Sequence, residues 1–253
     1  MIIAHITDTH ILPSGDPAPK AAIRANALRR CVADIARLAP DLVIHTGDAT
    51  QHGDPEEYAH FKELLSDIEA PIYMTPGNRD ERSAMRGAFA HLPESGEFLH
   101  YAVEDYPVRL VAFDTTGPHP RKGFACEERI DWFERTLAAA PDRPTIVFMH
   151  HPPLDIEALY ENGYNDSAQA AALERVIARH PHIIRVLFGH VHFSKCFDWA
   201  GSLASTMGSV AVDVRKGMDG SGRDAEPLYQ VHTWENAEDG AGTLTTQTRI
   251  PSP

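Results

Sequence analysis

The sequence predicts an α/β protein in which two β-sheets pack together between helices. Up to His192, short apolar runs typical of buried strands alternate with amphipathic helical segments. After His192 the chain consists of short strand-like pieces separated by Gly, Ser and Thr. No internal repeat, low-complexity tract or long linker interrupts the 253 residues. We therefore expect a single domain over residues 1–253.

Strands and helices are expected to alternate from the start of the chain. A strand over residues 2–7 precedes a helix over 20–38, in which apolar side chains recur at helical spacing. A buried strand over 42–46 leads to a second helix. The stretch Asp54-Pro55-Glu56-Glu57 places a capping residue, a proline and acidic residues at the start of that helix, which we expect to continue through Ile68.

The rest of the chain shows the same apolar patterns. Further helices are expected over residues 81–91, 127–140 and 167–179, of which 127–140 mixes apolar and charged positions as a surface helix does. Further strands are expected over residues 71–74, 98–103, 109–114, 145–149, 183–188, 195–199, 203–207, 228–234 and 244–250.

Composition excludes several classes of protein. A hydrophobic content of 43% with 23% charged residues is globular, and the formal charge of -13 argues against a broad nucleic-acid-binding surface. No run approaches the roughly 20 apolar residues of a membrane span. The chain starts with a strand that lacks the features of a signal peptide, so we expect a cytoplasmic protein. Three widely spaced cysteines give neither a disulfide framework nor a zinc signature.

Polar side chains follow five of the expected strands. A strand places residues i and i+2 on the same face, so both imidazoles of Gly189-His190-Val191-His192 leave their strand end in one direction. Carboxyl ends of strands in open α/β sheets gather at one edge, so the side chains there should converge. The candidate metal ligands are Asp8, His10, Asp48, Asn78, His150, His190 and His192.

Seven nitrogen and oxygen ligands exceed the needs of one tetrahedral zinc ion. Two ions that share a carboxylate would use all of them. Carboxylate and imidazole groups suit manganese, iron, zinc or cobalt, and the sequence does not choose among these metals.

The order of motifs D-x-H, G-D, G-N, H-H-P and G-H-x-H resembles the calcineurin-like metallophosphoesterase superfamily. Residues 4–10, 53–58 and 148–154 are similar to class III cyclic-nucleotide phosphodiesterases and bacterial glycerophosphodiesterases. The resemblance implies a four-layer αββα sandwich. It also implies hydrolysis of small phosphodiesters by in-line attack of a hydroxide held between two metal ions.

The resemblance also implies a role for each ligand. Asp48 would bridge the two ions, and His151 would orient ligands or only pack beside Pro152. The other ligands would divide between a first ion held by Asp8, His10 and His192 and a second ion held by Asn78, His150 and His190.

One position departs from the family pattern G-N-H-[DE]. The family histidine is assigned to contact phosphate or protonate the leaving group, and here Arg79 takes its place. Arginine does not donate a proton usefully near neutral pH, but its planar fork suits a phosphoryl oxygen. We interpret Arg79 as an electrostatic clamp, with a salt bridge to Asp80 or Asp114 as the alternative.

The part of the chain after the last motif is expected to govern specificity. By the same resemblance, residues 193–226 would form a small β-rich cap or an oligomer contact and would select the substrate, and we expect a homo-oligomer. Alternative activities within the fold are those of a phosphomonoesterase or a phosphonate-ester hydrolase. A non-catalytic scaffold would normally lose ligands, whereas all seven positions are filled here.

Overall fold

The computed structural model describes residues 1–94, 96–156, 163–215, 226–236 and 242–252. The helices are α1 (Pro19–Leu38), α2 (Pro55–Leu64), α3 (Arg82–Ala88), α4 (Glu127–Ala138), α5 (Ser167–Ala178) and the short 3-10 helix η1 (Val212–Val214). The strands are β1 (Ile2–Ile6), β2 (Leu42–His45), β3 (Ile72–Met74), β4 (Tyr101–Val103), β5 (Arg109–Ala112), β6 (Thr145–Met149), β7 (Ile183–Phe188), β8 (Lys195–Trp199), β9 (Ser202–Thr206), β10 (Tyr229–Glu235) and β11 (Thr243–Arg249).

These strands form two mixed sheets. The first sheet has the order β11-β10-β1-β2-β3, with β1, β2 and β3 parallel and β10 antiparallel to both β1 and β11. The second has the order β4-β5-β6-β7-β9-β8, in which β5, β6, β7 and β9 are parallel. Both edge strands of the second sheet are antiparallel to their neighbours. The parallel strands of each sheet therefore bring their carboxyl ends to one edge.

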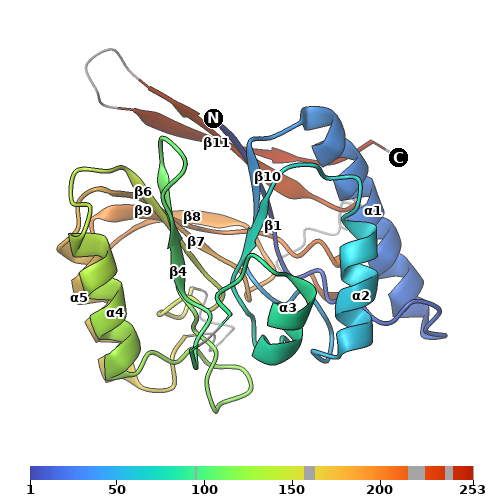
Figure 1. Cartoon of the computed structure of the whole chain (residues 1–253), viewed down its shortest axis with the longest axis horizontal. Helices are drawn as coiled ribbons and strands as arrows, with labels where there is room; N and C mark the ends of the chain where they lie inside the picture. The colour runs from blue at the N-terminus through green and yellow to red at the C-terminus, as the bar shows by residue number, and fades with distance from the viewer. Residues whose placement is uncertain (95, 157–162, 216–225, 237–241, 253) are drawn as a thin grey trace.

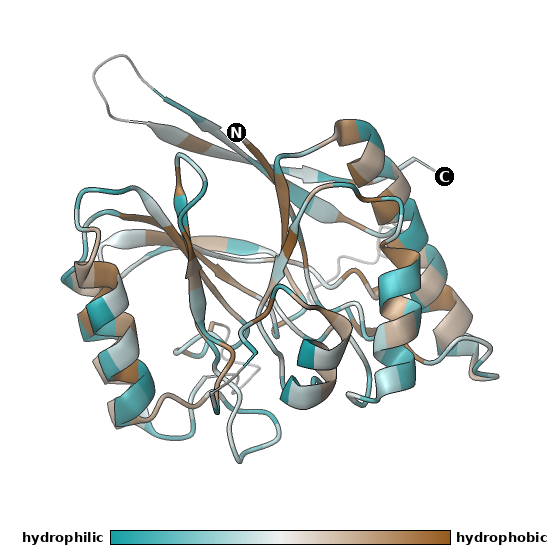
Figure 2. Ribbon diagram, in the orientation of Figure 1, coloured by the Kyte–Doolittle hydropathy of each residue, from teal (hydrophilic) through white to brown (hydrophobic). Residues whose placement is uncertain are grey.

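Helices cover the outer face of each sheet, which gives the expected four layers. Helices α1, α2 and α3 lie against the first sheet, and α4 and α5 lie against the second (Figure 1). A third apolar core fills the space between the sheets, where Ile3 and Ile44 of the first sheet meet Ile146 and Leu187 of the second. Figure 2 shows brown, hydrophobic residues along the central strands and mixed colours on the helices.

The structure gives a physical reason for two of the element ends that differ from the expectation. Helix α2 ends at Leu64, and hydrogen bonds between residues three apart, such as Ile68 N to Leu65 O at 3.0 Å, replace the helix that was expected to continue. Strand β4 begins at Tyr101 because the amide of Leu99 donates to Asp114 at 2.9 Å. The Asp114 side chain thus accepts a hydrogen bond from a backbone amide that would otherwise be available for strand pairing.

The β-rich part after His192 is divided between both sheets. Strands β8 and β9 extend the second sheet at its edge, and β10 and β11 complete the first. Residues 216–225 of the expected cap lie outside the described part of the chain. The roles of residues 193–226 in oligomer contact and substrate selection stay predictions. Among the described residues, no helix is long and apolar enough to span a membrane.

Candidate metal centre

The seven predicted ligands come together where the two sheets meet. The ends of β1, β2 and β3 in the first sheet and of β6 and β7 in the second supply them. Several contacts cross between the sheets, for example His150 Nδ1 lies 2.8 Å from the Thr46 carbonyl oxygen, and the His190 amide donates to Asp8 Oδ2 at 3.1 Å. The site therefore belongs to the junction of the sheets and not to one sheet alone.

A first group contains two carboxylates and two imidazoles. One ligand atom from each of Asp8, His10, Asp48 and His192 lies within 4.8 Å of the others. His192 Nε2 is 3.1 Å from Asp8 Oδ1 and 3.3 Å from His10 Nε2, and His10 Nε2 is 3.7 Å from Asp48 Oδ2. This group has the composition expected for the first ion together with the shared carboxylate.

A second group contains the imidazoles of His150, His151 and His190, again within 4.8 Å of one another. His150 Nε2 lies 3.3 Å from Asn78 Oδ1 and 3.5 Å from Asp48 Oδ1. The two oxygens of Asp48 thus face different groups, since Oδ2 faces His10 and Oδ1 faces His150. His151 lies closer to this group than the resemblance implied.

The backbone holds most of these ligands in a left-handed conformation. Non-glycine residues rarely have positive φ, and such residues persist only where their surroundings impose it. Hydrogen bonds from Asp8 N to Gly47 O and from His10 N to Asp48 O, both 3.0 Å, tie the ends of β1 and β2 together. The ligands with positive φ are Asp8 (51°), His10 (47°), Asp48 (54°), His190 (70°) and His192 (62°).

The motif glycines are explained by close approach. A Cβ on Gly189 would collide with Thr7 Oγ1, Thr46 O and Asp8 Oδ2, and a Cβ on Gly77 would collide with Asp48. Only glycine at positions 189 and 77 therefore lets these chain segments lie so close to a carboxylate. The glycines of G-H-x-H and G-N thus let these two chain segments approach Asp8 and Asp48.

The charges of the site fit divalent cations. Asp8 and Asp48 are 0% and 2% exposed, and no Lys or Arg side chain of the described chain pairs with either. Burial and the charge of Asp8 raise the pKa of Asp48 well above its usual range. Burial also lowers the pKa of His10 and His151 well below the ordinary value, so these rings are neutral and offer lone pairs at neutral pH. Bound cations would relieve the repulsion between the carboxylates.

Arg79 lies beside the shared carboxylate. Its backbone amide donates to Asp48 Oδ1 at 2.7 Å, and its side chain is exposed. The expected alternative, a salt bridge from Arg79, is not formed within the described residues. Asp114 pairs with Arg82 at 2.6 Å, and Asp80 accepts hydrogen bonds from Tyr58 and from backbone amides.

His151 is fixed on one side only. Its Nδ1 lies 2.9 Å from Thr115 Oγ1, while its buried Nε2 has no hydrogen-bond partner in the described structure. The centroid of the His151 ring lies 4.7 Å from that of His150 and 4.5 Å from that of His190. The orientation of this ring is therefore set by Thr115, a residue outside every motif.

Other residues that hold the ligands were also missed by the motifs. His192 Nδ1 lies 2.9 Å from the carbonyl oxygen of Val214 in η1, whose neighbour Asp213 pairs with Arg24 of α1 at 2.7 Å. Arg24 also donates to the His10 carbonyl oxygen at 3.1 Å. These residues are far apart in the sequence and match no local pattern, so only their packing reveals them.

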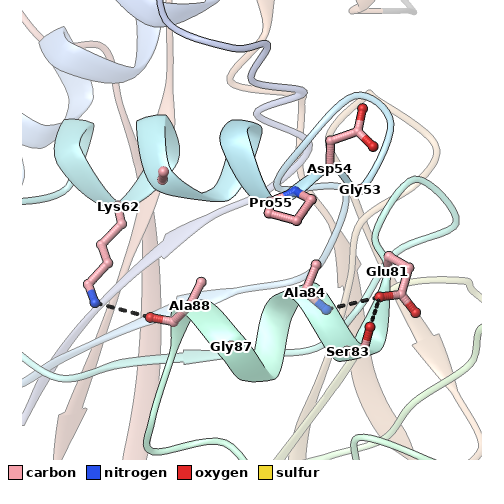
Figure 3. Close-up of a pocket in the computed structure, with 10 residues that line it drawn as sticks. Gly53, Asp54, Pro55, Lys62, Glu81, Ser83, Ala84, Gly87 and Ala88 are labelled. Atoms are coloured by element: carbon pink, nitrogen blue, oxygen red, sulfur yellow. Dashed lines mark hydrogen bonds between the residues drawn. The ribbon is translucent and has the colours of Figure 1, made fainter.

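A surface pocket of about 730 Å³ lies between α2 and α3 (Figure 3). Several of its polar side chains are already engaged. Lys62 donates to the Ala88 carbonyl oxygen at 3.1 Å, and Glu81 accepts from the Ala84 amide at 2.9 Å and from the Ser83 hydroxyl. None of the seven predicted metal ligands lines this pocket.

Comparison with known proteins identifies the family. The family model for calcineurin-like phosphoesterases matches residues 1–194. A protein of Arcobacter nitrofigilis named as a probable glycerophosphodiester phosphodiesterase, GpdQ, is 32% identical over 253 residues, covering 97% of this chain and 92% of that protein. The Escherichia coli K12 protein named 3',5'-cyclic adenosine monophosphate phosphodiesterase CpdA is 31% identical, covering 79% of this chain and 72% of that protein.

Solved structures show the same fold. A dimetal phosphatase from Danio rerio superposes with a TM-score of 0.74 at 14% identity, covering 100% of this chain and 99% of that one. This likeness concerns the fold, and the sequence matches carry the assignment. With the family model spanning most of the chain and the strand-end motifs gathered at one site, the chain belongs to the calcineurin-like phosphoesterase family.

Proposed function

We propose that the protein hydrolyses small phosphodiesters, of the cyclic-nucleotide or glycerophosphodiester type, with a pair of divalent metal ions. The observation that carries this proposal is the position of Asp48 between two groups of nitrogen and oxygen ligands. The names of the relatives, a glycerophosphodiester phosphodiesterase and a cyclic adenosine monophosphate phosphodiesterase, support the substrate class.

Each ligand has a place in this proposal. One cation would lie with Asp8, His10 and His192, the other with Asn78, His150 and His190, and Asp48 would contact both. When bound, such a pair lowers the pKa of a water molecule and stabilises charge on phosphoryl oxygens. Nitrogen and oxygen donors suit manganese, iron, zinc or cobalt.

Two residues beside the ligands would act on the substrate or on the centre. The exposed guanidinium of Arg79 would bind a phosphoryl oxygen, for which its paired donors are suited. His151, held by Thr115, would orient the second ligand group or contact the substrate through its free Nε2 atom. Neither residue needs to transfer a proton in this arrangement.

A phosphomonoesterase is the second candidate, because the fold neighbour from Danio rerio is named a dimetal phosphatase. A phosphonate-ester hydrolase would use the same groups. The ligand set serves all three reactions, so the choice depends on how the surroundings of the centre accept the second ester group of a diester.

The test combines metal analysis with turnover. We expect wild-type protein to bind two ions per chain and, when loaded with Mn²⁺, to hydrolyse bis(p-nitrophenyl) phosphate faster than the monoester. A screen of cyclic nucleotides, glycerophosphodiesters and phosphonate esters then identifies which class of substrate is hydrolysed best.

The matched variants are Asp48→Asn and Asp67→Asn, the second at an exposed position away from the centre. Asp48→Asn should lose more activity than the roughly 10- to 100-fold typical of an outer-shell partner, and Asp67→Asn should lose none. Fewer than one bound ion per wild-type chain after reconstitution would favour a non-catalytic scaffold.

A further inference from the structure

A continuous series of hydrogen bonds runs from the metal centre through the space between the sheets to the outer strand β11. Its members are, in order, Asp8, Thr7, Thr46, His5, His232 and Thr246. All members except Thr246 are fully buried, with 0% exposure, and Thr246 is exposed. The series joins three strands of the first sheet and spans residues that are 227 positions apart in the sequence.

The inner half of the series is short and tightly bonded. Thr7 Oγ1 donates to Asp8 Oδ2 at 2.7 Å, Thr46 Oγ1 donates to Thr7 Oγ1 at 2.7 Å, and His5 Nε2 lies 3.0 Å from Thr46 Oγ1. A carboxylate only accepts, and each hydroxyl has a single proton. Thr7 must therefore donate to Asp8, Thr46 must donate to Thr7, and the remaining proton between His5 and Thr46 must come from His5.

The outer half continues the same direction. Burial lowers the pKa of His5 to about 3 and that of His232 well below its ordinary value, so both rings are neutral and carry one N–H each. With its N–H at Nε2, His5 accepts at Nδ1 from His232 Nε2, 3.4 Å away. His232 then accepts at Nδ1 from the Thr246 hydroxyl at 2.8 Å. Every donor points toward Asp8.

The series acts on one oxygen of Asp8. Oδ2 receives the Thr7 hydroxyl and also the His190 amide at 3.1 Å. Oδ1 receives neither and lies 3.1 Å from His192 Nε2 and 3.8 Å from His10 Nε2. The two oxygens are thus divided between the protein interior and the first ligand group.

We propose that His5 and His232 are positioning residues that, through Thr46 and Thr7, hold Asp8 with only Oδ1 directed at the first cation. This inference rests on the proposed function, because it assumes that a cation occupies the first ligand group. Bonds in an aligned series polarise one another, so each added donor strengthens the bond at Asp8. Partners of this kind typically change metal affinity 10- to 100-fold in metalloproteins.

The first experiment measures metal affinity. Zn²⁺ binding by competition with a chelating dye is compared for wild type, Thr46→Val and Thr46→Ser. The valine keeps the shape of the side chain and the backbone contact to His150 but removes the hydroxyl. We therefore expect the dissociation constant of the first site to be about 10- to 100-fold larger. Serine keeps the hydroxyl and should restore affinity. Circular dichroism confirms that both variants fold.

The exposed end of the series allows a gentler substitution. Thr246→Val removes the outermost donor, and we expect a severalfold loss of affinity at the same site. Thr245→Val, an exposed neighbour on β11 outside the series, is the matched control and should bind as wild type does. Wild-type affinity in both Thr46→Val and Thr246→Val would overturn the positioning role and leave the proposed function intact.

The second experiment reads the tautomers without any metal. NMR of ¹⁵N-histidine-labelled protein should show Nε2–H for both His5 and His232. The competing arrangement has His5 Nδ1–H donate to Gln230, which pairs with His5 across β1 and β10 and whose Oε1 has no hydrogen-bond partner in the described structure. An Nδ1–H tautomer at His5 would break the series and overturn the inference. Failure of wild-type protein to bind cations would instead overturn the proposed function, and the positioning role with it.

Discussion

The backbone amide and the side chain of Arg79 have different surroundings. Its amide donates to Asp48 Oδ1 at 2.7 Å, while its guanidinium is exposed and forms no ion pair with the described residues. Because the amide belongs to the backbone, substitution of the side chain leaves the support of Asp48 in place. The proposed contribution of the guanidinium to substrate binding can therefore be measured separately from the support of Asp48.

For Arg79→Ala, we expect kcat/KM for a phosphodiester to fall about 10²- to 10³-fold, the usual effect of losing one group that stabilises transition-state charge. Metal content should not change. Arg79→Lys should recover only part of the activity, because an ammonium lacks the planar fork. Arg29→Ala, at an exposed arginine of α1, is the control. Unchanged kcat and KM in Arg79→Ala would show that the interpretation of Arg79 as an electrostatic clamp is wrong.

The absence of the family histidine leads to a further expectation at the same position. Without a proton donor beside the leaving group, the rate should depend steeply on leaving-group pKa. A flat dependence across a series of aryl phosphodiesters would contradict it.

At the scale of elements, the start of α2 organises the loop that follows Asp48. Glu57 is fully buried, and its carboxylate accepts from the amides of His52 at 2.8 Å, Gly53 at 3.0 Å and Asp54 at 3.4 Å. Asp54 and Glu57 form a capping box. One helix terminus thus fixes the loop between Asp48, the proposed shared ligand, and α2.

We expect Glu57→Ala to lower the free energy of unfolding by more than the roughly 1 kcal/mol typical of a lost cap. The reason is that the buried Glu57 carboxylate contacts three backbone amides and the His52 ring, and all four contacts are lost at once. Glu56→Ala, on the exposed face of the same turn, should change stability by no more than about 0.5 kcal/mol. Urea unfolding measures both, and equal effects would contradict this account.

At the scale of the whole molecule, the first sheet buries histidines that must stay neutral. Burial lowers the pKa of His5 and of His45 to about 3, far from their ordinary value of 6.5. In the unfolded chain both rings bind protons below about pH 6.5, while in the folded chain they do not until about pH 3. The unfolded state therefore binds more protons across this window, and acid favours it.

We expect the free energy of unfolding to be greatest above pH 6.5 and to fall as the pH decreases from 6.5 toward 5. Each buried histidine contributes up to about 1.4 kcal/mol per pH unit. Urea unfolding of metal-free protein at several pH values measures this slope. His119→Gln, which removes an exposed histidine, should leave the slope unchanged. Stability that does not change over this range would contradict this expectation.

The sequence by itself determined the strands, the order of the motifs and the seven metal-competent residues. Short-range physics suffices for these features. Apolar runs such as residues 145–149 and 183–188 form strands where expected, and the polar residues directly after them must lie at strand ends. The capping residues of α2 likewise act within one helical turn.

Only the tertiary structure decided which strand ends share a sheet and which residues contact and orient each candidate ligand. The ligands come from two sheets, His151 lies within the second group, and His5 contacts His232 across the length of the chain. Asp114 likewise takes the amide of Leu99 and shortens β4. These contacts join side chains with no fixed spacing in the sequence, because sheet order and the packing of the two sheets bring them together. Local patterns therefore identify the candidate ligands, whereas the surroundings that orient these residues follow from the assembled fold.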